Sequence, residues 1–295
     1  MSPETLAAQP DVRYYAPRSL DEAIRLLSED EAAVLAGGTD LLVQVRAGAR
    51  RPASYVDIKR IADVMQATFD ASGARLGAAM PAAALADEAE LARRWPGLAE
   101  ACRLIGSAQI QGRATIGGNL CNASPAADTT AALIVNRARL HLAGPSGVRT
   151  VDAEQFVTGP GKTALGRGEL LVAIEVPTPA PRTADAYLRL IPRTEMDIAV
   201  AGAAVSLTLD ASGVCRAARV AMAAVAPTAR LVAEASESLV GSRVDEAALE
   251  RAARAASAAA HPIDDRRGTI AYRRAVVGVL TRRAASIAAE RARVR

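Results

Sequence analysis

The sequence contains little cysteine or histidine, and this shortage excludes several kinds of metal site. Its 295 residues include three cysteines, Cys102, Cys121 and Cys215, and two histidines, His141 and His261. These residues lie far apart in the chain, so they do not form the ligand spacing of a zinc or iron–sulfur site. We therefore expect any metal chemistry to belong to another chain.

Aromatic residues, net charge and long apolar runs are also scarce. Aromatics make up 3% of the chain, and 36 basic residues barely exceed 32 acidic ones, which argues against a nucleic-acid partner. The longest apolar run, residues 198–209, is interrupted by Gly202 and Ser206 and is too short to span a bilayer. With no apolar leader segment and an odd number of scattered cysteines, the sequence predicts a cytoplasmic protein without membrane insertion.

The residues that are present predict a folded chain that begins with a small α/β unit. A hydrophobic fraction of 51% and a length of 295 residues suit two or three domains. A capping box at Ser19–Glu22 predicts a helix after Ser19. A strand at 32–36, a glycine turn, a helix and a strand at 55–58 should follow. This order predicts a parallel α/β unit over residues 1–60.

The rest of the chain is expected to form two further units. In residues 61–178 the patterns predict strands near 74–77 and 170–176, helices near 98–105 and after Asp128, and a hairpin at 139–151. A proline-rich break at 177–183 follows. Beyond it, strands at 187–191, 199–209 and 214–225 should precede helices near 228–240, 245–260 and 269–290. Residues 184–292 are thus predicted to form a C-terminal α+β domain with a three-stranded sheet and helices.

A pair of glycines separates the first predicted strand from a helix, in LAGGTDLL at residues 35–42. Glycine lets the backbone approach a phosphate without an intervening Cβ atom, and a helix N-terminus offers unpaired N–H groups. This arrangement suits a pyrophosphate. A tight turn capped by Thr39 or Asp40 explains the same residues, so both interpretations stay open.

A second concentration of glycine and polar residues is ATIGGNLCNASPAAD, residues 114–128. Gly117 and Gly118 again permit a close backbone approach, while Asn122 and Asp128 add hydrogen-bonding groups. Asp128 could equally cap the helix that follows. Two glycine loops rich in groups that bind sugar and phosphate predict one extended dinucleotide held between two subdomains.

These stretches resemble the FAD-binding subunit of the molybdenum hydroxylases, the family of xanthine dehydrogenase and carbon monoxide dehydrogenase medium subunits. The resemblance runs from LAGGTDLLVQVRAG through IGSAQIQGRATIGGNLCNASPAAD and FVTGPGKTALGRGELLVAIEVP to HPIDDRRGTIAYRR, residues 261–274. The motifs follow the family's order and cover nearly the whole chain. The TIGGN…SPAAD element is highly specific.

The resemblance implies an α+β fold and a set of cofactor-binding residues. The fold would be a two-subdomain FAD-binding fold of the PCMH or vanillyl-alcohol-oxidase type, followed by the C-terminal α+β domain. The first glycine loop would hold the pyrophosphate side of FAD through Val34, Leu35, Ala36, Gly37, Gly38, Thr39, Asp40 and Leu41. The second would hold the cofactor through Thr115, Gly117, Gly118, Asn119 and Asn122, with Asp128 in the ribityl or phosphate region.

The neighbouring motifs add Ile105, Leu171 and Arg189 to the residues that the resemblance assigns to FAD. Some relatives have an aromatic residue at the position of Ile105 and a lysine at that of Arg189. The contacts of these two positions to the flavin ring therefore stay open.

The resemblance further implies an FAD-dependent oxidoreductase subunit that has no catalytic side chain of its own. A large partner would carry molybdopterin and oxidise the substrate, and a small partner would carry [2Fe-2S] clusters that pass electrons to FAD. The acceptor would be NAD⁺, O₂ or another molecule, and the complex a dimer of heterotrimers. Two alternatives stay open: a self-sufficient flavin oxidoreductase, which the lack of an acid–base pair near the motifs disfavours, and a non-catalytic FAD- or nucleotide-binding scaffold.

Overall fold

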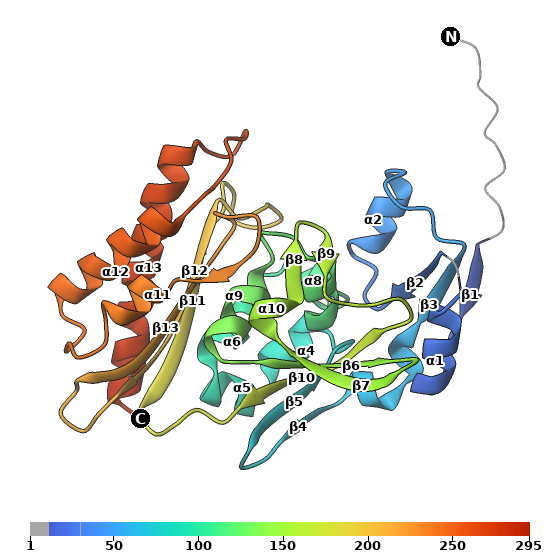
Figure 1. The fold of residues 1–295 in the computed structure, drawn as a ribbon, viewed down its shortest axis with the longest axis horizontal. Coiled ribbons are helices and arrows are strands. Elements are labelled where there is room, and N and C mark those ends of the chain that lie inside the picture. Colours follow the sequence, from blue (N-terminus) through green and yellow to red (C-terminus); the bar gives the residue numbers. More distant parts are fainter. Residues whose placement is uncertain (1–11, 30) are drawn as a thin grey trace, which may run out of the picture.

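The computed structural model describes residues 12–29 and 31–295, so the first eleven positions of the predicted N-terminal unit lie outside it. The described residues form sheets of three, five and four strands and a two-stranded ribbon. The three larger sheets follow one another along the long axis of the molecule, from the N-terminal unit in blue to the C-terminal domain in orange and red (Figure 1). No helix among the described residues has both the length and the apolar character needed to cross a membrane.

The N-terminal unit is a parallel sheet in the order β1-β3-β2. Its elements are β1 (Arg13–Tyr15), α1 (Leu20–Leu27), β2 (Ala32–Leu35), α2 (Leu41–Arg46), β3 (Ser54–Asp57) and the 3₁₀ turn η1 (Ile58–Arg60). The predicted start of α1 is confirmed, because the Ser19 hydroxyl accepts a hydrogen bond from the Glu22 N–H. The three-residue β1 is too short for its side-chain alternation to be recognised in the sequence.

The middle unit is an antiparallel sheet in the order β4-β5-β10-β6-β7. Its strands are β4 (Ala67–Phe69), β5 (Gly73–Gly77), β6 (Arg139–Gly144), β7 (Gly147–Asp152) and β10 (Leu170–Pro177), and β8 (Val157–Gly159) and β9 (Lys162–Thr163) form the separate ribbon. Its helices are α3 (Ala62–Met65), α4 (Ala82–Asp87), α5 (Ala89–Arg94), α6 (Pro96–Arg103), α7 (Ala108–Gln111), α8 (Ile116–Asn122), α9 (Asp128–Val135) and α10 (Ala153–Phe156).

The glycine-containing part of the predicted second loop is a helix. Residues 116–122 form α8, and the Thr115 hydroxyl caps it by accepting from the Gly118 N–H at 2.9 Å. Two adjacent glycines disfavour a helix by propensity. The threonine cap and tertiary packing outweigh that preference here.

The C-terminal domain contains the three predicted strands, but its sheet has four. The elements are β11 (Thr183–Leu190), β12 (Ala201–Leu209), β13 (Cys215–Ala223), β14 (Arg230–Leu231), α11 (Ala233–Glu237), α12 (Glu246–Ala259) and α13 (Ile270–Arg293). The prediction of a helix from residue 228 is wrong, because Arg230 and Leu231 pair with β13 and the helix begins at Ala233. A two-residue edge strand has no periodicity by which the sequence could predict it.

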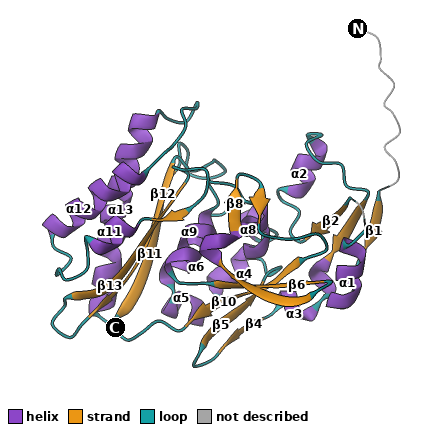
Figure 2. Ribbon diagram, in the orientation of Figure 1, coloured by secondary structure: helices purple, strands orange, loops and turns teal. Residues whose placement is uncertain are grey.

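Both faces of the C-terminal sheet are covered, which joins it to the middle unit. Ala203 and Val205 of β12 belong to a core with α12 and α13, whereas Ala204 between them belongs to the core of the middle unit. This alternation is the period of a strand, whose successive side chains point to opposite faces. Figure 2 shows α11, α12 and α13 on the outer side of this sheet and α6 and α9 on the side of the middle unit.

A buried carboxylate from the C-terminal domain caps a helix of the middle unit. Asp185 of β11 is 2% exposed and accepts hydrogen bonds from the Gly97 N–H at 3.0 Å and the Leu98 N–H at 3.2 Å, in the first turn of α6. The Asn136 side chain donates to the same carboxylate at 2.7 Å. A Cβ atom on Gly97 would lie 2.8 Å from the backbone of Ala186, so glycine permits this close approach.

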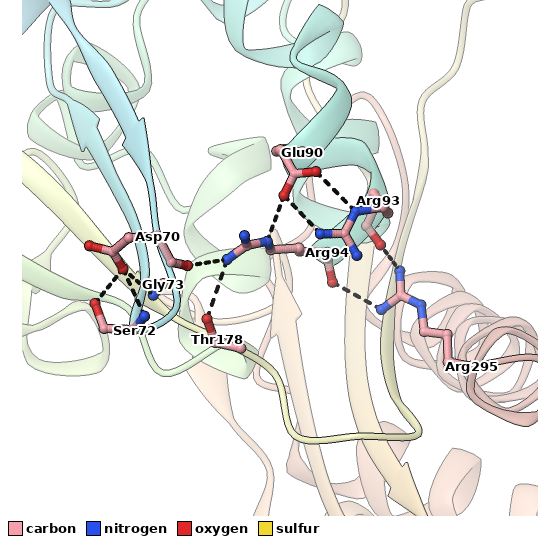
Figure 3. Close-up of polar contacts among 8 residues, drawn as sticks. All are labelled: Asp70, Ser72, Gly73, Glu90, Arg93, Arg94, Thr178 and Arg295. Atoms are coloured by element: carbon pink, nitrogen blue, oxygen red, sulfur yellow. Dashed lines mark hydrogen bonds and ion pairs between the residues drawn. The ribbon is translucent and has the colours of Figure 1, made fainter.

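Two arginines make further polar contacts on the surface, and those of Arg295 join the middle unit to the C-terminal domain (Figure 3). Arg94 of α5 donates to the carbonyl oxygen of Asp70 at 2.6 Å and pairs with Glu90. Arg295 donates to the carbonyl oxygens of Arg94 at 3.0 Å and Thr183 at 2.9 Å. Because the Arg295 guanidinium meets the carbonyl oxygens of Arg93 and Arg94 at the end of α5, it complements the negative end of that helix.

Asp185→Ala is expected to lower the free energy of unfolding by about 3 kcal/mol, because two buried N–H groups and the Asn136 amide lose their acceptor. Chemical denaturation followed by circular dichroism measures the change. Asp87→Ala, which removes an exposed carboxylate at the end of α4, is the control and should change stability by less than about 0.5 kcal/mol. Equal losses in the two variants would contradict the capping role of Asp185.

Candidate cofactor-binding site

The first glycine turn and α8 face each other across a cavity of about 850 Å³, here called cavity 1. The turn lies between β2 and α2 of the N-terminal unit, and α8 belongs to the middle unit. The ribbon of β8 and β9 and the loop after it supply a further wall through Gly161, Thr163 and residues 165–171. Cavity 1 therefore lies where the N-terminal and middle units meet.

Four consecutive backbone N–H groups in the first turn have no hydrogen-bond acceptor among the described residues. They belong to Gly37, Gly38, Thr39 and Asp40, all of which line cavity 1. Main-chain donors that converge without internal partners form a concavity that suits an anion. Since α2 spans only six residues, its helix dipole is small, and the unpaired N–H groups would supply most of the attraction for an anion.

The glycines of the site are required mainly by contacts between backbones. A Cβ atom on Gly37 would lie 1.9 Å from the carbonyl oxygen of Arg113, and one on Gly117 would lie 2.5 Å from that of Ala78. Gly38 has a positive φ of 76°, which an L side chain rarely adopts. The missing side chain of Gly37 lets the N-terminal and middle units touch, and that of Gly117 lets α8 approach the backbone of Ala78 within the middle unit. That these glycines also leave room for a phosphate stays a prediction.

The second element offers side-chain amides rather than main-chain donors. The Gly117 N–H donates to the Ala78 carbonyl oxygen at 2.9 Å, and the Gly118 N–H to the Thr115 hydroxyl at 2.9 Å, so both are already used. Asn119 accepts from Thr129 through Oδ1, and Asn122 accepts from Gln44 through Oδ1 at 2.8 Å. Both amide groups thus have their acceptor atoms engaged while their residues line the cavity.

The bond between Gln44 and Asn122 links α2 to α8 across cavity 1. It joins residues of the N-terminal and middle units, and both side chains are partly buried. Gln44 is absent from the residues predicted from the sequence, although it is the one uncharged polar residue on the helical stretch LLVQVR. That signal alone could have marked it as a candidate.

A second cavity of about 890 Å³, cavity 2, adjoins the first on the side of the C-terminal domain. Thr39, Asp40, Ile105, Asn119 and Asn122 line both cavities. Each volume lies within the range of about 300–1,000 Å³ that is typical of ligand pockets. Together the two cavities suit an elongated ligand better than a compact one.

A buried ion pair lies in the wall of cavity 2. Arg189 of β11 donates from Nη1 to both carboxylate oxygens of Asp128, at 2.9 and 2.8 Å, and the two side chains are 6% and 7% exposed. Burial raises the pKa of Asp128 to about 6, although the charge and hydrogen bonds of Arg189 and the Tyr187 hydroxyl oppose this shift. The Nε of Arg189 is buried and has no hydrogen-bond partner among the described residues.

The predicted site residues divide between the two cavities. All of them except Leu35, Asp128 and Arg189 line cavity 1. Asp128 and Arg189 line cavity 2 and pair with each other, and Asp128 is the first residue of α9 rather than its cap. Leu35 lines neither cavity.

The loop at 161–171 is the largest part of the cavity wall that the sequence prediction did not assign. Only Leu171 was predicted there, whereas Gly161, Gly166, Gly168 and Glu169 also line cavity 1. The sequence signal that could have identified this part of the wall is the concentration of three glycines in eight residues, GKTALGRG.

The cysteine in the wall of cavity 1 is poorly suited to redox chemistry. Burial raises the pKa of the Cys121 thiol to about 12, so the thiolate is scarce at neutral pH. No cluster of three or more histidine, cysteine, aspartate or glutamate residues that could hold a metal ion occurs in residues 12–29 and 31–295.

Comparison with known proteins identifies both parts of the chain. Residues 10–179 match the FAD binding domain in molybdopterin dehydrogenase, and residues 186–288 match the CO dehydrogenase flavoprotein C-terminal domain. The carbon monoxide dehydrogenase medium chain of Afipia carboxidovorans is 36% identical over 282 residues, or 95% of this chain and 97% of that protein. The xanthine dehydrogenase FAD-binding subunit of Escherichia coli O157:H7 is 35% identical over 218 residues, or 73% of this chain and 74% of that protein.

Solved structures agree with these matches. A chain of the Cu,Mo-CO dehydrogenase in its cyanide-inactivated form is similar with a TM-score of 0.91 and 35% identity, covering 95% of this chain and 98% of that one. A chain of quinoline 2-oxidoreductase from Pseudomonas putida 86 is similar with a TM-score of 0.90 and 29% identity, covering 96% and 99%. The predicted fold and family are confirmed, and this chain belongs to the FAD-binding medium subunits of the molybdenum hydroxylases.

Proposed function

We propose that this chain is the electron-transfer subunit of a heteromeric molybdenum hydroxylase, with FAD bound along cavities 1 and 2. Its FAD would accept electrons from [2Fe-2S] clusters in a small partner subunit, and substrate would be oxidised at molybdopterin in a large one. The electrons would pass to NAD⁺, O₂ or another acceptor. We further propose that the complex is a dimer of heterotrimers in the cytoplasm. Within this chain, residues 1–60 and 61–178 would form the two FAD-binding subdomains, and residues 184–292 the C-terminal domain.

The run of unpaired N–H groups from Gly37 to Asp40 is the observation that carries the proposal. A pyrophosphate supplies the acceptor oxygens that these donors lack, and it forms the middle of FAD. The turn lines cavity 1 and Asp40 also lines cavity 2, so a cofactor anchored there can extend in both directions. These donors, together with the match to an FAD binding domain, support the fit of FAD to the residues present.

Bound FAD supplies the redox chemistry, since a flavin exchanges electrons singly or as a pair. The residues of this chain bind and orient it. The amides of Asn119 and Asn122 would replace water around its polar groups, while the apolar side chains of Ile105 and Leu171, 7% and 2% exposed, exclude water from the cavity wall. None of them needs to exchange a proton.

Arg189 is proposed to meet the cofactor in cavity 2. Its Nη1 is held by Asp128, while its Nε has no acceptor within the described residues. An unpaired buried donor is costly, so an acceptor atom of a ligand in cavity 2 would relieve that cost. Because Asp128 already pairs with Arg189 and Tyr187, it would act on the cofactor chiefly by holding Arg189.

Purification of the protein from its native host tests the proposed function. The visible spectrum is expected to show a flavin, and subunits containing iron–sulfur clusters and molybdenum should co-purify, because the proposal places those centres in partners. Colourless protein without bound nucleotide would contradict FAD binding. A yellow protein that oxidises a substrate without partners would instead favour a self-sufficient flavin oxidoreductase.

Gly118→Val is expected to abolish FAD retention. Gly118 lines cavity 1, and its Cβ would lie 2.8 Å from the Thr115 hydroxyl, so a branched side chain would enter the cavity and disturb the cap of α8. Gly112→Val is the matched control, since Gly112 is exposed, lines neither cavity and leaves 3.7 Å to the nearest atom. The flavin-to-protein ratio measures retention, and circular dichroism checks folding. Full FAD content in folded Gly118→Val protein would count against α8 as part of the site.

A further inference from the structure

Lys59 lies behind the first glycine turn and is not part of the wall of either cavity. Its ammonium donates to the carbonyl oxygen of Ala36 at 2.9 Å and to Asp57 Oδ1 at 2.6 Å. The Tyr14 hydroxyl donates to the other oxygen of the same carboxylate at 2.6 Å. A chain of three side chains, contributed by β1, β3 and η1, thus ends on the backbone of the turn.

The ammonium of Lys59 is held in one place by this chain. The Lys59 and Asp57 side chains are 29% and 12% exposed. Burial disfavours the charge of Asp57, but hydrogen bonds from Lys59 and Tyr14 outweigh it and lower the pKa of the carboxyl. The carboxylate is therefore charged at neutral pH, and its bond to Lys59 is a charge-assisted one.

The contact with Ala36 sets the direction of the next N–H group. In a trans peptide the C=O of one residue and the N–H of the next point in opposite directions, and the described residues contain no cis peptide. Because Lys59 holds the Ala36 oxygen on the side of β3, the Gly37 N–H points away from Lys59. Gly37 lines cavity 1, and its N–H has no acceptor among the described residues.

We infer that Lys59 is a positioning residue for the cofactor: it anchors the Ala36 carbonyl and thereby aims the Gly37 N–H at the pyrophosphate in cavity 1. This inference rests on the proposed function, since it assumes FAD in that cavity. Lys59 itself does not reach the phosphates and acts through the peptide group. The rigid turn then binds the pyrophosphate without the cost of ordering its own backbone.

The residue type fits this role. Lysine occurs at only two positions of the sequence, 59 and 162, among 36 basic residues. An ammonium is a compact centre whose three donors reach the Ala36 carbonyl and the Asp57 carboxylate at once. Position 59 is thus one of the few places where this arginine-rich chain uses a lysine.

Lys59→Met tests the inference in the full-length chain freed of flavin, with FAD, ADP and riboflavin as probes in equilibrium titrations. FAD and ADP carry the pyrophosphate, and riboflavin does not. We expect the Kd for FAD and for ADP to rise about tenfold or more, while that for riboflavin stays unchanged. The loss of affinity should persist in about 1 M salt, because it depends on a fixed hydrogen bond. At that ionic strength screening confines interactions between exposed charges to about 3 Å.

Lys162→Met is the matched control. Lys162 is exposed on β9 beside two residues of the wall of cavity 1, but it does not line the cavity, so its loss removes the same charge without touching the turn. Unchanged FAD and ADP affinity in this variant supports the inference. An equal loss in both variants, a loss that disappears in high salt, or a Lys59→Met protein that binds all three probes normally would overturn it.

Two further measurements keep the outcome clear. If Lys59→Met does not fold, Asp57→Asn is the second variant, because it removes the charge that holds the ammonium while Lys59 stays in place. Asp57→Asn should weaken ADP binding about threefold. Normal ADP binding by this variant would overturn the inference. A wild-type chain that binds neither FAD nor ADP would refute the proposed function itself. A wild-type chain that binds both, with no change in the variants, refutes only the role of Lys59.

Discussion

The contact between Gly37 and the carbonyl oxygen of Arg113 is the constraint on which the site depends. A Cβ atom at position 37 would lie 1.9 Å from that oxygen, so the two units can approach this closely only with glycine there. The approach sets the first turn opposite α8 and leaves cavity 1 between them. It also brings Gln44 within hydrogen-bonding distance of Asn122, which ties the units together a second time.

The two sides of cavity 1 contribute different chemistry because their backbones are satisfied differently. The first turn leaves its N–H groups unpaired, whereas α8 uses those of Gly117 and Gly118 within the protein. Main-chain donors suit phosphate oxygens, and the amide nitrogens of Asn119 and Asn122, whose oxygens are already engaged, can donate to polar groups of a ligand. One elongated cofactor with a charged middle and polar arms can satisfy both sides at once.

The C-terminal domain completes the site through buried polar contacts rather than through apolar packing alone. Asp185 caps α6, and Arg189 pairs with Asp128 at the start of α9. The desolvation of a buried ion pair offsets much of the attraction between its charges, but removal of one partner is strongly destabilising because it leaves the other charge buried and unpaired. These contacts therefore fix where β11 lies on the middle unit, and with it the wall of cavity 2.

The sequence by itself determined the order of most elements, the family and the two glycine motifs that face each other across cavity 1, because caps, strand alternation and glycine motifs are local signals. The start of α1 at Ser19 and the motifs around Gly37 and Gly118 could be recognised in this way. Only the tertiary structure decided that the second motif is a helix, that Asp128 pairs with Arg189 and that Lys59 holds the Ala36 carbonyl. The physical reason is that a donor's partner lies tens of residues away, and no local pattern records which groups the fold brings together.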